Sequence, residues 1–190
     1  MNIDKNDLSN IGNTDETSIY LDMINDYTWN TKGEKNIRIK SFGKEKIRIK
    51  VMPTILADGT KLPLFFVVKG NKGKRKEKTL HNNEYVKKGL AFVYSQDNAW
   101  VYNQLFLNYL EDIWFNEKTN SNLFNRILII DRATTHFNEN NNKIFSKYKN
   151  KYCLIPAGCT YFLQPLDVAI NKPLKDCIKE EIKNIKNLSH

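Results

Sequence analysis

Apolar positions in the first half of the chain alternate and then run together, in a pattern that predicts a β-hairpin. Residues 45–56 (EKIRIKVMPTIL) alternate before they become apolar, residues 57–60 (ADGT) are typical of a turn, and residues 61–69 (KLPLFFVVK) are again mostly apolar. Short apolar runs on both sides of a turn sequence indicate two paired strands. Pro53 and Pro63 favour bends or edge positions, because proline cannot donate to a strand ladder.

Two later segments have apolar side chains at helical spacing. Residues 100–114 predict a largely buried helix, whose apolar positions are Val101, Leu105, Phe106, Tyr109, Leu110, Ile113 and Trp114. Residues 171–188 predict a closing helix with Pro173 in its first turn, where proline is tolerated. The apolar positions of this closing helix are Leu174, Ile178, Ile182, Ile185 and Leu188.

Short apolar runs between these helices predict further strands. Residues 126–130 (RILII) and 151–156 (KYCLIP) each have strand length, and an asparagine-rich helix or loop lies between them. Strands that alternate with helices favour an α/β fold, in which a mixed sheet carries helices on its faces. Because the chain has no internal repeat, residues 1–190 are expected to form one domain.

Composition indicates a soluble, intracellular chain with reduced thiols. The chain has 190 residues and is 41% hydrophobic, which is enough for a substantial core. The longest apolar run, residues 62–68, has the length of a strand, and the first ten residues are too polar for a signal peptide. Cys153, Cys159 and Cys177 are odd in number and form no CxxC pair, so neither disulfides nor a zinc site is expected.

The net charge of +9 favours a polyanionic partner, because lysines release counterions when they neutralise phosphates. A general enrichment in lysine, asparagine and isoleucine explains the same charge without selection for DNA. Residues 69–78 (KGNKGKRKEK) form the densest basic segment. This basic loop could follow a phosphate backbone, act as a nuclear import signal or simply be solvated. Its candidate DNA contacts are Lys69, Lys72, Lys74, Arg75 and Lys76.

Three aspartates follow elements that should end close together. Asp131 ends the strand at 126–130, Asp15 lies in a polar, weakly extended segment, and Asp167 comes two residues after Pro165, which suits a helix start. Like charges that converge repel unless they share a proton or a metal, so a divalent cation with oxygen ligands is one explanation. Each aspartate also has a simpler reading as a turn residue or as a carboxylate at a helix amino terminus.

Four blocks of the sequence carry a resemblance that favours the metal site. They are residues 13–23 (NTDETSIYLDM), 32–70 (KGEKNIRIKSFGKEKIRIKVMPTILADGTKLPLFFVVKG), 128–137 (LIIDRATTHF) and 154–182 (LIPAGCTYFLQPLDVAINKPLKDCIKEEI). In order and spacing they resemble the endonuclease domain of the DDE superfamily. The version is that of the pogo, Tigger and jerky group of mariner-like transposases, to which centromere protein B is related.

This resemblance implies a ribonuclease-H-like fold with a mixed five-stranded sheet and helices on both faces. It implies that Asp15, Asp131 and Asp167 are catalytic and hold two Mg²⁺ or Mn²⁺ ions for DNA phosphodiester cleavage and strand transfer. In this group the third acid is commonly an aspartate about thirty-five residues beyond the second, and thirty-five residues separate Asp131 from Asp167. Among neighbouring residues, Lys69, Arg132, Gln164 and Lys172 would be expected to position phosphate.

Two departures from the family pattern keep a second function open. Arg132 stands where relatives commonly have an uncharged residue, and a guanidinium there could pair with a catalytic carboxylate. No segment resembles the amino-terminal helix-turn-helix modules with which such transposases recognise DNA ends. The alternative is therefore a catalytically inactive, domesticated or truncated module that binds DNA or takes part in an assembly.

The expected partner is DNA, in the nucleus if the source is eukaryotic. Self-association stays an open alternative, and neither a membrane nor a small-molecule substrate is expected.

Overall fold

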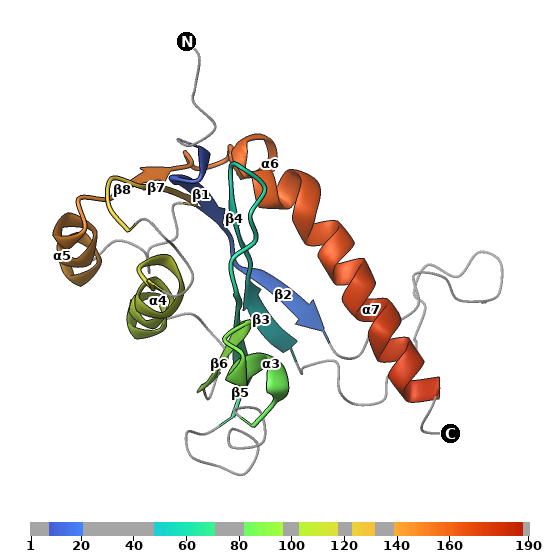
Figure 1. The fold of residues 1–190 in the computed structure, drawn as a ribbon. Coiled ribbons are helices and arrows are strands. Elements are labelled where there is room, and N and C mark those ends of the chain that lie inside the picture. Colours follow the sequence, from blue (N-terminus) through green and yellow to red (C-terminus); the bar gives the residue numbers. More distant parts are fainter. Residues whose placement is uncertain are drawn as a thin grey trace.

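The computed structural model describes residues 8–20, 48–70, 82–96, 103–117, 123–131 and 139–187. Figure 1 shows the arrangement of its elements. The strands are β1 (Ile11–Thr14), β2 (Thr17–Tyr20), β3 (Arg48–Met52), β4 (Thr54–Leu56), β5 (Leu64–Lys69), β6 (Ala91–Gln96), β7 (Ile127–Ile130) and β8 (Lys151–Leu154). The helices are α3 (Glu84–Lys87), α4 (Asn103–Tyr109), α5 (Glu139–Lys147), α6 (Thr160–Leu163) and α7 (Asn171–Asn187). Two π-helical segments, η1 (Leu110–Trp114) and η3 (Leu166–Ile170), extend α4 and precede α7.

The described strands fall into two groups, ordered β4-β1-β7-β8 and β2-β3-β5-β6. A shared register joins the groups. Thr14 pairs with Thr54 in the β1–β4 ladder and Thr17 with Val51 in the β2–β3 ladder, so the same antiparallel alignment continues across the gap. The break falls at Pro53, which has no N–H to donate. β1 and β2 therefore occupy one strand position of a mixed sheet, and β4 and β3 occupy the next.

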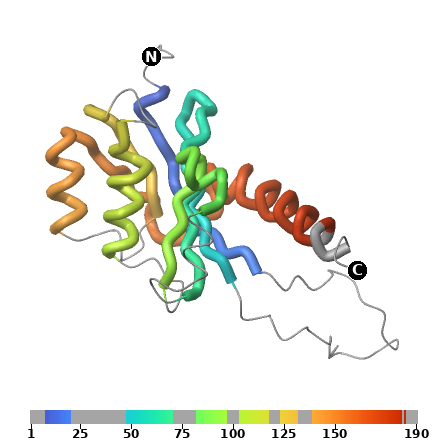
Figure 2. The backbone as a smooth tube through the Cα atoms, turned by 60° about the horizontal axis from the view of Figure 1, so that its bottom comes forward, coloured from blue at the N-terminus to red at the C-terminus, as the bar shows by residue number. Residues whose placement is uncertain are grey.

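Helices cover both sides of this sheet, as Figures 1 and 2 show: α4 and α5 lie on one side, and α6 and α7 on the other. The core lies mainly under α4 and η1. Their buried side chains are Leu105, Phe106, Tyr109, Leu110, Ile113 and Trp114, and they pack with Met52, Phe65, Val67, Leu128 and Ile130 from the sheet. These helical residues belong to the apolar face that the sequence predicted.

Gly12 lets η1 approach the sheet closely. A Cβ built on this glycine would lie 2.7 Å from Cη2 of Trp114, which is fully buried. Trp114 is held from its other side by Arg126, whose guanidinium lies 3.6 Å from the ring centroid and whose Nη1 donates to the Trp114 carbonyl at 2.8 Å. Only glycine leaves room for the indole against β1 at this position.

Most of the predicted elements are confirmed within the described residues. The hairpin is present as β3 and β4 followed by β5, with antiparallel pairs such as Val51 with Phe66. The expected order of helices and strands after it holds as well, with α7 beginning at Asn171 and carrying Pro173 in its first turn. Residues 97–102, the start of the predicted helix at 100–114, lie outside the described residues.

The sheet is wider than the five strands predicted. β6 pairs in parallel with β5 over six residues and adds an edge strand that the sequence pattern did not indicate. All three cysteines are free, as expected. None of the described helices has both the length and the hydropathy needed to cross a bilayer.

Candidate functional site

Asp15 lies at the break between β1 and β2. The shared register places it opposite Pro53, where the ladder has no backbone donor. Side-chain hydroxyls join the two strands at this break: Thr14 Oγ1 donates to the Pro53 carbonyl at 3.0 Å, and Thr54 Oγ1 donates to Thr14 Oγ1 at 3.1 Å. The strand is therefore interrupted at Asp15, which carries the first carboxylate, while these hydrogen bonds hold the neighbouring backbone in place.

Asp131 follows β7 directly, beside Asp15. In the parallel β1–β7 ladder, Ile11 pairs with Ile127 and Asn13 with Ile129. Continuing that register by two residues sets Asp131 next to Asp15, and neighbouring strands lie about 4.8 Å apart. The charge of Asp131 raises the pKa of Asp15, which agrees with this placement.

Asp167 comes to the same place from η3, the helical segment that precedes α7. Pro165 stands immediately before η3, so Asp167 is in the first turn, as the sequence predicted. A single amide connects this carboxylate to the strand: Asn171 Nδ2 donates to Asp15 Oδ2 at 2.7 Å and to Asp167 Oδ1 at 2.8 Å. The structure therefore brings together the three aspartates that were selected from the sequence.

A buried pair of amides fastens the start of this helical segment to β1. Asn13 Nδ2 donates to Gln164 Oε1 at 2.6 Å and to the Ile129 carbonyl at 3.0 Å, and Asn13 Oδ1 accepts from the Leu166 N–H at 3.2 Å. Gln164 Nε2 in turn donates to the Thr14 carbonyl at 3.1 Å. Gln164 is fully buried and bonded within the protein. The sequence analysis expected it to position phosphate, but its burial fits a supporting role behind the carboxylates.

Burial and repulsion together raise the pKa of Asp15 from its ordinary 3.8 to about 6. Burial is the largest cause, and the charge of Asp167 is the second; the charge of Asp131 adds a smaller contribution. Hydrogen bonds from Asn171 and Gln164 act in the opposite direction and lower the pKa. The cluster thus concentrates negative charge in a setting that disfavours it, which is typical of a site that needs a cation.

The donor set fits a hard divalent cation. Mg²⁺ and Mn²⁺ prefer oxygen ligands, and the three aspartates supply carboxylate oxygens whose mutual repulsion a cation would relieve. As they stand, no three His, Cys, Asp or Glu side chains among the described residues are close enough to hold one ion. Like charges push carboxylates apart, so the side chains would have to draw together around a metal.

Of the basic residues predicted to contact DNA, the described part of the chain includes Lys69 and Lys172. Lys172 is exposed and follows Asn171, the residue that bonds to two of the acids. Lys69 is exposed at the far end of β5, level with Arg48 and Tyr20 by strand register. That is five residues along the strand from Asp15, or roughly 17 Å. Lys72, Lys74, Arg75, Lys76 and Arg132 lie outside the described residues.

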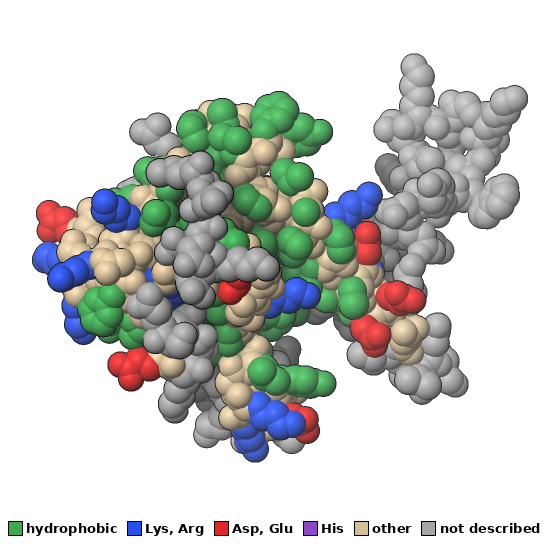
Figure 3. Space-filling view, turned by 45° about the horizontal axis from the view of Figure 1, so that its top comes forward, with side chains coloured by type: hydrophobic (Ala, Val, Ile, Leu, Met, Phe, Trp, Pro, Cys, Tyr) green, Lys and Arg blue, Asp and Glu red, His purple; other side chains and the backbone are tan. Residues whose placement is uncertain are grey.

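Basic side chains are not gathered on the face drawn in Figure 3, where the described lysines and arginines are interspersed with acidic and apolar side chains.

Lys50 is a cation at the site that the sequence analysis missed. It lies in β3, is only 8% exposed and forms an ion pair with Glu16, the residue after Asp15. Burial lowers the pKa of Lys50, and the negative charge of Asp15 opposes that shift. The sequence did contain a signal for this buried cation, because Lys50 stands next to the apolar residues that end the strand predicted at 45–56.

Two asparagines of the site also had a sequence signal. Asn13 precedes Asp15 by two residues in an extended segment, and residues two apart in a strand share a face. Asn171 follows Asp167 by four residues, and residues four apart in a helix lie on the same side. Polar residues at these spacings from a candidate acid are the ones to examine for supporting contacts.

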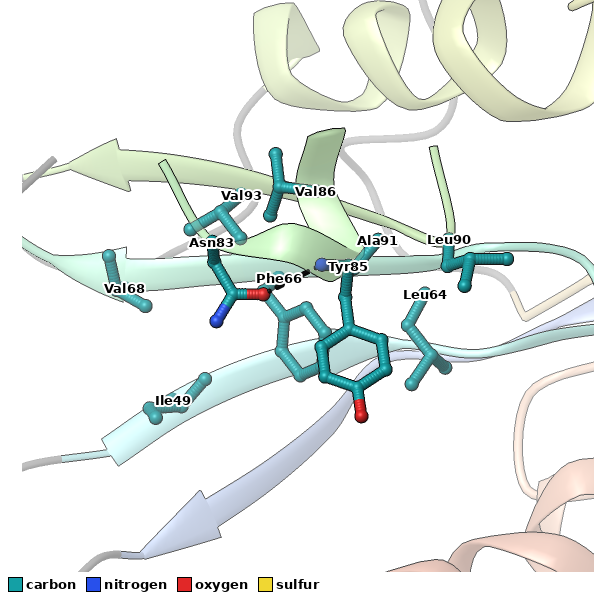
Figure 4. Close-up of a pocket in the computed structure, with 10 residues that line it drawn as sticks. All are labelled: Ile49, Leu64, Phe66, Val68, Asn83, Tyr85, Val86, Leu90, Ala91 and Val93. Atoms are coloured by element: carbon teal, nitrogen blue, oxygen red, sulfur yellow. Dashed lines mark hydrogen bonds between the residues drawn. The ribbon is translucent and has the colours of Figure 1, made fainter. Parts of the chain in front are cut away.

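A separate apolar hollow lies away from the acids. Its volume is about 370 Å³, and it is lined by side chains of β3, β5, β6 and the α3 region, including Phe66, Tyr85 and Val93 (Figure 4). None of the three aspartates lines it. The candidate site is therefore the exposed junction of strand and helix ends, and not this hollow.

Comparison with known proteins matches the chain to one family. A family model described as DDE superfamily endonuclease matches residues 46–188. The proteins named "Pogo transposable element with KRAB domain" from Mus musculus and Homo sapiens are 28% and 27% identical to the chain over 182 residues. Each match covers 94% of this chain and 28% of the relative, so the chain spans less than a third of these relatives' length.

A solved structure shares the fold. The structure titled "Mos1 transposase paired-end complex with left transposon end" matches with a TM-score of 0.52 and 12% identity. The match covers 95% of this chain and 47% of that chain. This likeness confirms the predicted ribonuclease-H-like arrangement of sheet and helices.

Proposed function

The chain belongs to the DDE superfamily of endonucleases, and on that premise we propose that it cleaves DNA phosphodiester bonds and transfers strands with divalent metal ions. One observation carries the proposal. Asp15, Asp131 and Asp167 meet at adjoining strand and helix ends, and the two acids from distant segments raise the pKa of Asp15. No local structure explains this meeting, because Asp15 and Asp131 are 116 positions apart in the sequence.

In this proposal each aspartate provides carboxylate oxygens to Mg²⁺ or Mn²⁺. Two such ions, when bound, would activate the attacking oxygen and stabilise the leaving oxygen of an in-line displacement. Asp15 and Asp131 come from neighbouring strand positions and set one edge of the site, while Asp167 closes it from η3. Asn13 and Gln164 hold η3 against β1, and so keep the third carboxylate within reach of the first.

DNA is the proposed partner. The charge of +9 favours a phosphate backbone, and the exposed Lys172 follows Asn171 directly in the helix that carries this contact to the acids. Contacts of this kind position the backbone and carry no sequence information. In a eukaryotic cell, a substrate of this kind would place the protein in the nucleus.

A plasmid-nicking assay tests the proposal. Purified protein is incubated with supercoiled DNA in Mg²⁺, in Mn²⁺ and in EDTA, alongside Asp131→Asn and the control Asp176→Asn. Asp176 is an aspartate of α7 whose side chain is 57% exposed and which pairs only loosely with Lys179, at 3.8 Å. Asp131→Asn keeps the shape but removes a metal-binding charge, so we expect it to abolish cleavage and retain DNA retardation in gels. The control should cleave like the wild type.

The same assay decides between the two functions left open by the sequence. If the wild type retards DNA but never nicks it in either metal, the chain is a catalytically inactive DNA-binding module. If Asp131→Asn nicks as fast as the wild type, cleavage comes from a contaminant or from another site, and the proposed role of the three aspartates is wrong.

A further inference from the structure

Asn171 occupies an unusual position between two carboxylates. It is the first residue of α7 and only 3% exposed. Its Nδ2 donates to Asp15 from the strand and to Asp167 one helical turn earlier, at 2.7 and 2.8 Å. Its Oδ1 is buried and has no hydrogen-bond partner among the described residues. The orientation of the Asn171 side chain is therefore set by the two hydrogen bonds of its nitrogen.

Asn171 uses only one oxygen of each carboxylate. The amide contacts Oδ2 of Asp15 and Oδ1 of Asp167, so one oxygen of each acid carries no bond to Asn171. An amide nitrogen has two N–H groups, and each can satisfy one carboxylate. A neutral donor draws the two acids together without adding or removing charge at the site.

We propose that Asn171 is the positioning residue of the metal site: its two N–H groups fix the relative orientation of Asp15 and Asp167, so that their remaining oxygens face one cation. This role rests on the proposed function, in which those acids hold divalent metal. Groups that hydrogen-bond to metal ligands orient them and raise metal affinity. In this role Asn171 acts through the two carboxylates that its nitrogen binds.

The alternative is an ordinary core asparagine that only helps the helix to dock. Asn13 and Gln164 already fasten the helical segment to β1 through three hydrogen bonds. Removing Asn171 should therefore leave the fold in place while the two carboxylates lose their common donor. A purely structural residue would lower stability and leave the affinity of the folded protein for metal unchanged.

The experiment measures Mn²⁺ binding by titration calorimetry, which needs no cleavage activity. Asn171→Leu removes both donors at similar size, and Asn171→Ala removes them without adding bulk or charge. Asn184→Leu, at an exposed position on the same helix, is the matched control. Circular dichroism and thermal unfolding in EDTA establish that each variant is folded. Should Asn171→Leu fail to fold, Asn171→Ala decides the question.

We expect both Asn171 variants to bind Mn²⁺ about 10- to 100-fold more weakly, as other changes to groups behind metal ligands do. The control should bind like the wild type. Any nicking by Asn171→Leu should recover as Mn²⁺ is raised, because only metal binding is impaired. If the wild type binds Mn²⁺ and the Asn171 variants bind it with equal affinity, the positioning role is wrong and the proposed function stands. A wild type that binds no Mn²⁺ would overturn both.

Discussion

Asp15→Asn should stabilise the metal-free protein at neutral pH, although it removes a candidate catalytic residue. The carboxylate of Asp15 is partly buried and is repelled by Asp167 and Asp131, and these effects raise its pKa to about 6. A folded-state pKa above the ordinary 3.8 means that the folded chain holds the proton more tightly than the unfolded chain. Stability is therefore lost as the pH rises from about 4 to about 6, and the loss persists above that range.

The size of the effect follows from the same values. The difference between a pKa of about 6 and the ordinary 3.8 corresponds to roughly 3 kcal/mol, at 1.36 kcal/mol for each pKa unit. Asparagine has the same shape, carries no charge, and its oxygen can still accept from Asn171. The variant should thus gain up to roughly 3 kcal/mol at pH 8, which is about 6 to 12 °C in Tm for a domain of this length. At pH 4 little of this gain should remain.

Urea unfolding in EDTA at pH 4 and pH 8, followed by tryptophan fluorescence, measures this difference. Trp114 is fully buried and lies in the core beside β1, so its emission reports loss of that packing. Asp176→Asn is the control, since its exposed carboxylate should change stability little at either pH. The reasoning is refuted if Asp15→Asn is less stable than the wild type at pH 8, or if its gain is the same at both pH values.

Two further predictions concern the partner and the packing. Alanine at Lys72, Lys74, Arg75, Lys76 and Lys78 should weaken binding to all DNA sequences about equally and flatten the salt dependence, which is roughly −0.9 in log–log slope for each duplex phosphate contacted. Filter binding at several salt concentrations checks this, and an unchanged slope would leave the loop a solvated surface or an import signal. Gly12→Ala should lower the free energy of unfolding by about 1 to 3 kcal/mol, because its methyl group would collide with Trp114. An unfolding curve that matches the wild type would contradict the close approach of η1 to β1.

The three acids were candidates from the sequence pattern, and the family resemblance favoured them over a role as turn or helix-start residues. Asp131 ends an apolar strand, and Asp167 follows a proline that suits a helix start. The parallel register then brings Asp131 beside Asp15, since β1 and β7 keep a constant offset that carries past the last strand residues. Hydrophobic patterning identifies such elements in the sequence, and Asp131 and Asp167 lie at their ends.

The supporting amides could not be selected in the same way. The bonds between Asn13 and Gln164 and between Asn171 and Asp15 join residues more than 150 positions apart. Spacing marks Asn13 and Asn171 as neighbours of a candidate acid, but no local pattern records which distant group each amide will meet. Lys50 was missed for a related reason, because its partner Glu16 lies at the neighbouring strand position and not nearby in sequence.

The extra edge strand escaped because its pattern is weak. Residues 91–96 (AFVYSQ) alternate in burial, but two of the three intermediate side chains, Phe92 and Tyr94, are aromatic and pack against the core. Such a strand lacks the polar alternation that identifies a half-buried edge. Its parallel pairing with β5 became evident only from the fold.

A crystal grown in Mn²⁺, with anomalous diffraction recorded for manganese, tests the central claim most directly, because it locates the metal without any assay of activity. The claim predicts anomalous peaks among the carboxylates of Asp15, Asp131 and Asp167, with Mn²⁺–oxygen distances of about 2.0 to 2.2 Å. It is contradicted if well-ordered crystals show no peak there, or if Asp167 turns away from Asp15 and Asp131 while manganese binds elsewhere.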